Sequence, residues 1–212
     1  MKIDWLGRID YQAALRIQEE RLEHCLHCGE ESVILLEHEP VYTIGRLPDK
    51  SSLQVVDRLP YPWFETNRGG QATYHGPGQL VVYPILDLRA RGRDLHRYLR
   101  NLEYLLIDLL KEFGIQGTRV EGKTGVWVDD RKIASIGVGV RKWVTMHGFA
   151  LNVTSDLSGF LNIVPCGLCG VKMTSVSLES ANEVPLETVR ERMAPYLHRY
   201  LGLDDSSVLS PK

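Results

Sequence analysis

The apolar residues follow two different periods in neighbouring segments, and this constrains the fold more than any other feature. Between residues 94 and 113 they recur every three or four positions, which is typical of an amphipathic helix that Asp94 begins and Gly114 ends. From Gly125 to Val153 they alternate with polar residues, as in consecutive β-hairpins. Because helices and strands are mixed but do not alternate strictly, we expect an α/β (α+β) fold with a mixed β-sheet flanked by helices.

The remaining elements have weaker signals. A helix between Asp10 as N-cap and Gly29 as C-terminal stop would carry Leu15, Leu22, Cys25 and Leu26 on one face, and a last helix would cover residues 185–201. Short strands are expected at Val33–Glu37, near Val41–Ile44 and near Leu53–Val56. No internal repeat, linker or low-complexity stretch is evident, so residues 1–212 are expected to form one domain.

Charge and hydropathy exclude several classes of protein. The chain has 25 basic and 27 acidic residues, a net charge of −2. Such a balance lacks the basic excess of a nucleic-acid-binding protein. No apolar run approaches the roughly 18 residues that a membrane span requires, and the N-terminus does not resemble a signal peptide. We therefore expect a soluble, cytoplasmic protein that contacts neither nucleic acid nor membrane.

The four cysteines form two Cys-x-x-Cys pairs, Cys25 with Cys28 and Cys166 with Cys169. Two such pairs can bind zinc, but the long stretch between them is unusual for a zinc site. Cys25 fits a small buried apolar residue on a helix face. Cys166 lies between Pro165 and Gly167 in an expected loop, where a thiol can be exposed and reactive.

Residues 68–79 contain four glycines interleaved with hydrogen-bonding side chains, a composition that favours a binding loop over a plain turn. Their spacing matches neither a P-loop nor a dinucleotide fingerprint. Lys132 opens an expected strand, where a lysine is ordinarily exposed to solvent. Gly137 within the same strand suggests a close approach of another backbone.

Four segments, taken together, closely resemble the lipoyl(octanoyl)transferases of lipoate biosynthesis. These segments are residues 68–85, 132–137, 147–153 and 165–167. The resemblance extends from about Glu37 to Ser175. It implies the fold of the catalytic domain of biotin and lipoate protein ligases. It also implies transfer of octanoyl from acyl carrier protein to a lysine of lipoyl domains through an enzyme thioester.

The resemblance also implies roles for individual residues. Cys166 resembles the nucleophile that accepts the acyl group, and Lys132 resembles its partner. The substrate-contacting segments would be Arg68, Gly69, Gly70, Gln71, Ala72, Thr73, Tyr74 and His75, then Ser135, Ile136 and Gly137, then Gly148, Phe149 and Ala150. The family pattern does not require a cysteine at position 169. The glycines at 69, 70, 137 and 148 would leave room for the acyl chain.

The implied partners are octanoyl-acyl carrier protein as donor, and the lipoyl domains of 2-oxoacid dehydrogenases and the glycine cleavage H protein as acceptors. No cofactor or metal is expected, because exchange between thioesters needs no ATP. His75 is an alternative base to Lys132, because an ordinary histidine titrates near neutrality. Two other functions stay open: an ATP-dependent lipoate or biotin protein ligase of the same fold, and a zinc-stabilised binding module.

An arginine cluster is the expected docking surface for the acidic carrier protein. It comprises Arg89, Arg91, Arg93, Arg97 and Arg100. The spacing of the last three predicts that they share one face of the helix beginning near Asp94.

Overall fold

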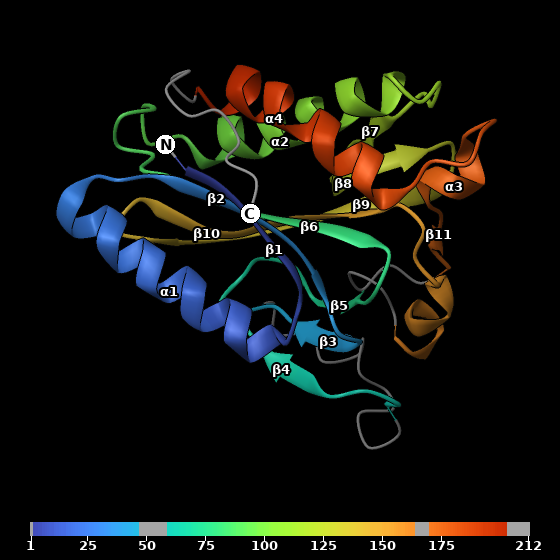
Figure 1. Ribbon diagram of the computed structural model, residues 1–212, viewed down its shortest axis with the longest axis horizontal. Helices are drawn as coiled ribbons and strands as arrows, with labels where there is room; N and C mark the ends of the chain where they lie inside the picture. Colours follow the sequence, from blue (N-terminus) through green and yellow to red (C-terminus); the bar gives the residue numbers. More distant parts are fainter. Residues whose placement is uncertain (1, 47–58, 164–169, 203–212) are drawn as a thin grey trace.

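The computed structural model describes residues 2–46, 59–163 and 170–202, which form a large sheet, a small sheet and flanking helices (Figure 1). The large sheet has the order β1-β2-β6-β10-β9-β8-β7, with β11 paired to β9, and the small sheet has the order β4-β3-β5. The strands are β1 (Lys2–Ile9), β2 (Ser32–His38), β3 (Val41–Ile44), β4 (Trp63–Glu65), β5 (Ala72–His75), β6 (Gln79–Ile85), β7 (Thr118–Val120), β8 (Lys123–Val128), β9 (Arg131–Arg141), β10 (Val144–Asn152) and β11 (Lys172–Met173). The helices are α1 (Tyr11–Cys28), α2 (Leu95–Lys111), α3 (Val176–Glu179), α4 (Leu186–Leu201) and the 3₁₀-helix η3 (Leu157–Asn162).

The large sheet is mixed, as expected. Strand β1 is parallel to β2, and β11 is parallel to β9. The other neighbours in the large sheet are antiparallel, including the β8-β9-β10 hairpins that the alternating pattern predicts. Hairpin connections are short, so residues 123–152 form three adjacent strands at the centre and one side of the sheet.

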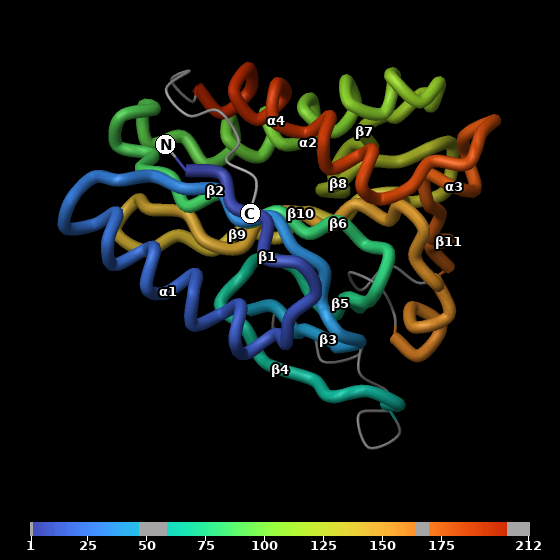
Figure 2. The backbone as a smooth tube through the Cα atoms, viewed as in Figure 1, coloured from blue at the N-terminus to red at the C-terminus, as the bar shows by residue number. Residues whose placement is uncertain are grey.

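Helices cover both faces of the large sheet. Figures 1 and 2 show α1 on one face and the packed pair α2 and α4 on the other. The face under α2 and α4 carries the largest hydrophobic core, which includes Leu102, Leu106, Val138, Phe149 and Leu197. Among the described residues, no helix is long and apolar enough to cross a bilayer.

Local signals place both ends of α1 and the start of α2 correctly, whereas α2 ends at Lys111, before the expected stop at Gly114. The Asp10 carboxylate accepts a hydrogen bond from the Ala13 N–H at 3.1 Å, and Gly29 ends α1 with a positive φ of 73°. The Asp94 carboxylate likewise accepts from the Arg97 N–H at 2.9 Å. These contacts satisfy backbone groups that a helix leaves without partners at its ends.

Several strands were not predicted, among them β1, β4 and β5. Strand β1 lies at an edge of the large sheet and has an irregularity between Trp5 and Arg8, so its residues do not alternate regularly. Strand β4 is short and mostly exposed, and β5 lies inside the segment expected to be a loop. The strand expected near residues 53–56 lies outside the described residues.

Candidate functional site

The glycine-rich segment is not one continuous loop. Residues 72–75 form β5, which is antiparallel to β3, with Thr73 opposite Thr43. Side chains alternate between the two faces of a strand, and this separates the expected contact residues. Ala72 and Tyr74 pack with Tyr42 and Phe160 in a separate hydrophobic cluster.

Most of the expected contact residues surround one cavity of about 40 Å³. It is lined by Arg68, Gly70, Thr73, His75, Ser135, Ile136, Gly137, Gly148, Phe149 and Ala150, and also by Tyr11, Thr43, Val81, Tyr83 and His147. The strand register explains the convergence, because Ser135–Gly137 of β9 pair directly with Gly148–Ala150 of β10. Gly69, Gln71, Ala72 and Tyr74 do not line this cavity.

Arg68 contributes a positive charge to the cavity wall. Its side chain is buried, and its guanidinium donates hydrogen bonds to both oxygens of Thr43 and to the Gly69 carbonyl. Gly69 in turn donates its N–H to the Val138 carbonyl at 2.9 Å, so residues 68–70 lie against β9. The guanidinium is thereby held in a fixed orientation beside the cavity.

Two of the glycines serve close packing rather than space for a substrate. A Cβ at Gly148 would lie 2.2 Å from the Val82 carbonyl oxygen on β6. A Cβ at Gly137 would lie 3.0 Å from the Arg68 Cδ atom and 3.1 Å from the Gly69 oxygen. The expectation that these two glycines leave room for an acyl chain is therefore replaced by a packing role.

His75 lies in a buried hydrogen-bond network. Its Nδ1 is 2.7 Å from the Gln79 Oε1, which can only accept, so Nδ1 carries the proton. Its Nε2 faces the Thr43 hydroxyl at 3.4 Å. Burial, followed by the neighbouring His38, lowers the pKa of His75 to about 3. This low basicity disfavours His75 as the general base at neutral pH.

Two further histidines near the cavity are also neutral. Burial lowers the pKa of His147 to about 3 and that of His38 to about 4. The His38 Nε2 lies 2.8 Å from the Tyr83 hydroxyl, and the His38 and His75 rings are 5.6 Å apart. Among the residues lining the cavity, Arg68 is therefore the charged one at neutral pH.

Lys132 is buried, contrary to the usual behaviour of a lysine at the start of a strand. Lys132 is 1% exposed, and its Nζ atom lies 5.4 Å from the centre of the Trp127 ring. Its backbone pairs with Met173 of β11, and its carbonyl accepts the Thr174 N–H at 3.0 Å. Lys132 is not among the residues lining the cavity, and Ser135, which does line it, lies three residues further along β9. Cys166 and Cys169 lie outside the described residues.

The cysteines of α1 behave as the helix pattern predicts. Cys25 is fully buried beside Leu22, Ile85 and Met146, and burial raises the pKa of its thiol to about 11. Cys28 is a free, exposed thiol. Within residues 2–46, 59–163 and 170–202, no group of three or more His, Cys, Asp or Glu side chains is placed to hold a metal.

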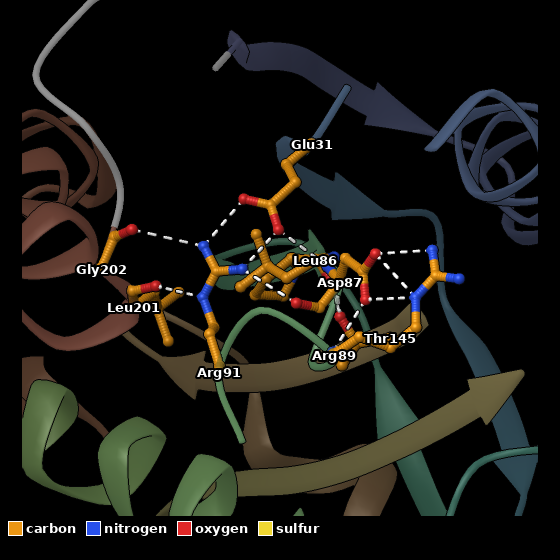
Figure 3. Close-up of polar contacts among 9 residues, drawn as sticks. Glu31, Leu86, Asp87, Arg89, Arg91, Thr145, Leu201 and Gly202 are labelled. Carbon is orange, nitrogen blue, oxygen red and sulfur yellow. Dashed lines mark hydrogen bonds and ion pairs between the residues drawn. The ribbon is translucent and has the colours of Figure 1, made fainter. Parts of the chain in front are cut away.

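Most of the arginine cluster is already engaged within the chain. Figure 3 shows Arg89 paired with Asp87, and Arg91 paired with Glu31 and bound to the Leu201 carbonyl. Arg100 forms an ion pair with the buried Glu103. Arg93 precedes α2 and has a positive φ of 54°, so it does not share the helix face of Arg97 as expected. In Figure 1 this loop lies at the opposite end of the large sheet from β11.

Comparison with known proteins identifies the family. A family model for the lipoyl protein ligase A/B catalytic domain matches residues 10–198. The octanoyltransferase of Citrifermentans bemidjiense is 52% identical over 198 residues, which cover 93% of this chain and 96% of the relative. The octanoyltransferase of Geobacter sulfurreducens is 51% identical over 205 residues, which cover 96% of this chain and 84% of the relative.

Solved structures support the expected fold. A putative lipoate protein ligase from T. acidophilum has a TM-score of 0.74 at 16% identity, covering 96% of this chain and 86% of that chain. The biotin protein ligase of Aquifex aeolicus has a TM-score of 0.55 at 11% identity, covering 95% and 69%. At such identities the likeness concerns the fold, whereas the octanoyltransferases are similar in sequence throughout. The chain belongs to the lipoyl protein ligase A/B catalytic domain family and, within it, to the octanoyltransferases.

Proposed function

We propose that this enzyme transfers an octanoyl group from octanoyl-acyl carrier protein to a lysine of lipoyl domains, with Cys166 as the acyl carrier and Lys132 as its partner. The observation that carries the proposal is the burial of Lys132 next to β11. Cys166 precedes Met173, the partner of Lys132 in the β9-β11 ladder, by seven residues. The family resemblance of residues 165–167 and 132–137 assigns the two roles.

The first step exchanges one thioester for another. The Cys166 thiolate attacks the carbonyl carbon of the octanoyl thioester, a new C–S bond forms, and the bond to the carrier sulfur breaks. The departing carrier thiolate takes up a proton. A nearby ammonium, here assigned to Lys132, favours the thiolate of Cys166 and can supply that proton.

The second step forms the amide. The amine of the acceptor lysine attacks the Cys166 thioester carbonyl, the C–S bond breaks, and the proton lost by the amine goes to Lys132, which returns it to the thiolate or to solvent. Lys132 is assigned this shuttle because the buried, neutral His75 is a weak base. The thioester of the donor supplies the driving force, so no nucleotide enters either step.

The cavity beside β9 and β10 is proposed to receive the acyl donor. Val81, Ile136 and Phe149 provide apolar wall, and each methylene buried against it is worth about 0.8 kcal/mol. Arg68 provides a fixed positive charge at the same wall. A structural relative is described together with its E2 lipoyl domain, which agrees with lipoyl domains of 2-oxoacid dehydrogenases and the glycine cleavage H protein as acceptors.

A transfer assay without ATP tests the reaction class. We expect the purified enzyme to octanoylate a lipoyl domain from octanoyl-acyl carrier protein, and we expect free octanoate with ATP to give no product. The reverse result would identify an ATP-dependent ligase. Stoichiometric zinc in the purified protein would favour the zinc-stabilised binding module.

Lys132 variants test the proton shuttle. Arginine keeps the positive charge but is effectively never deprotonated, so it cannot accept the proton of the incoming amine. We expect Lys132→Arg to form the thioester on Cys166 and to fail in transfer to the acceptor. Near-normal turnover of Lys132→Arg would rule out the shuttle.

A further inference from the structure

We propose that Trp127 is a positioning residue for Lys132, because the face of its indole ring holds the buried ammonium at the place where the reaction needs it. The inference rests on the proposed role of Lys132 and adds a residue that the sequence motifs did not single out. Trp127 lies on β8 and is directly opposite Lys132 of β9 in the antiparallel ladder. Figure 1 shows these two strands on the α2 side of the molecule.

The contact has the geometry of a cation–π interaction. The Nζ atom of Lys132 lies 5.4 Å from the centre of the Trp127 ring, within the roughly 6 Å range of such interactions. Trp127 is 2% exposed and Lys132 is 1% exposed, so water solvates neither group well. The negative face of the ring replaces part of the lost hydration of the ammonium. The ring therefore stabilises this ammonium more than it would stabilise one at the protein surface.

The backbone of β8 guides the aliphatic part of Lys132 toward the ring. Gly125 has a φ of +123°, and a Cβ there would lie 2.7 Å from the Lys132 Cε atom. The Gly125 N–H donates to the Glu103 carboxylate at 3.2 Å. Glu103 is fully buried in α2 and forms a 2.8 Å ion pair with Arg119. Helix α2 therefore fixes the strand against which the lysine side chain lies.

A second lysine over the same ring provides a matched control. The Nζ atom of Lys123 lies 5.3 Å from the Trp127 ring centre, but Lys123 is exposed. Water can solvate its ammonium with or without the ring, so Lys123 is not expected to contribute to transfer. Trp127 Nε1 is buried and has no hydrogen-bond partner among the described residues, so replacing Trp127 with Phe removes no hydrogen bond.

The test compares steady-state octanoyl transfer by wild type, Trp127→Met, Trp127→Phe and Lys123→Ala. Methionine fills the space without an aromatic face. We expect Trp127→Met to lower kcat by about 10- to 30-fold, the order of magnitude of a desolvated cation–π contact, with KM for the carrier within twofold. Trp127→Phe keeps a ring face and is expected to stay within about threefold of wild type, and Lys123→Ala is expected to be unchanged.

Circular dichroism establishes that each variant is folded, and Trp127→Leu replaces Trp127→Met if the methionine variant is not. A kcat within threefold of wild type for the folded variant without a ring would overturn the positioning role, as would an equal loss in Trp127→Phe. These outcomes leave the proposed function intact if Lys132→Ala is inactive. The proposed function itself fails if wild type gives no transfer without ATP.

Discussion

Substituting Gly148 with alanine distinguishes a packing glycine from a glycine that makes room for substrate. An alanine Cβ would lie 2.2 Å from the Val82 carbonyl oxygen and 2.7 Å from the Pro84 Cδ atom. Ordinary contacts begin near 3.4 Å, so β6 and β10 would have to separate by about 1 Å. Neither obstructing group can rotate away. We therefore expect a loss near the upper end of the usual overpacking range, about 3 kcal/mol in the free energy of unfolding.

Thermal unfolding measures this loss directly. For a chain of this length, about 3 kcal/mol corresponds to a fall in Tm of roughly 6–12 °C. Gly69→Ala is the control, because among the described residues its Cβ would meet only the Val138 oxygen, at 3.7 Å, and its Tm should change by less than about 2 °C. Folded Gly148→Ala should still prefer octanoyl donors. An unchanged Tm together with a preference for shorter acyl chains would refute the packing explanation.

Three further predictions concern charge and reactivity. Burial lowers the pKa of His75 to about 3 in the folded protein, so the unfolded chain binds more protons below about pH 6.5. The free energy of unfolding should therefore fall as the pH is lowered from 7 to 5, and His75→Gln should reduce this pH dependence. A thiol reagent should modify Cys28 in the native state, whereas Cys25 should react only after unfolding. Reversing Arg93 and Arg97 to Glu should raise KM for the carrier by at most about twofold and leave kcat unchanged, because the other arginines of the cluster already form ion pairs within the chain.

Each has a clear opposite outcome. A pH-independent stability of wild type between pH 7 and 5 would contradict the neutral buried histidines. Rapid native labelling of Cys25 would contradict its burial in the α1 core. A tenfold rise in KM for the arginine variant, abolished at high salt, would show that the carrier docks at that cluster after all.

Local sequence signals predict much of the fold and miss what depends on distant neighbours. Asp10, Gly29 and Asp94 set helix ends through contacts within a few residues, so sequence alone locates them. The β8-β9-β10 hairpins follow from alternation and short turns. In contrast, Leu95 shares a helix face with the buried Leu102 and Leu109 but is 37% exposed, because it is the first residue of α2 and lies beyond the core that covers the other two.

The candidate site shows the same limit. The motif segments of β9 and β10 meet because they are paired strands, which the hairpin pattern could have indicated. Thr43 and Tyr83 join the cavity from other strands, and their local sequence gives no sign of it. The burial of Lys132 depends on Trp127 across one hairpin, and counting residues back from the turn at Asp129 and Asp130 would have suggested their contact.

Intact-mass spectrometry after incubation with octanoyl-acyl carrier protein tests the central claim most directly. The account predicts that the protein gains the mass of one octanoyl group without ATP, that hydroxylamine removes it, and that Cys166→Ala abolishes it while Cys169→Ser does not. An octanoyl adduct that persists in Cys166→Ala, or one that appears only with ATP, would contradict transfer through a Cys166 thioester.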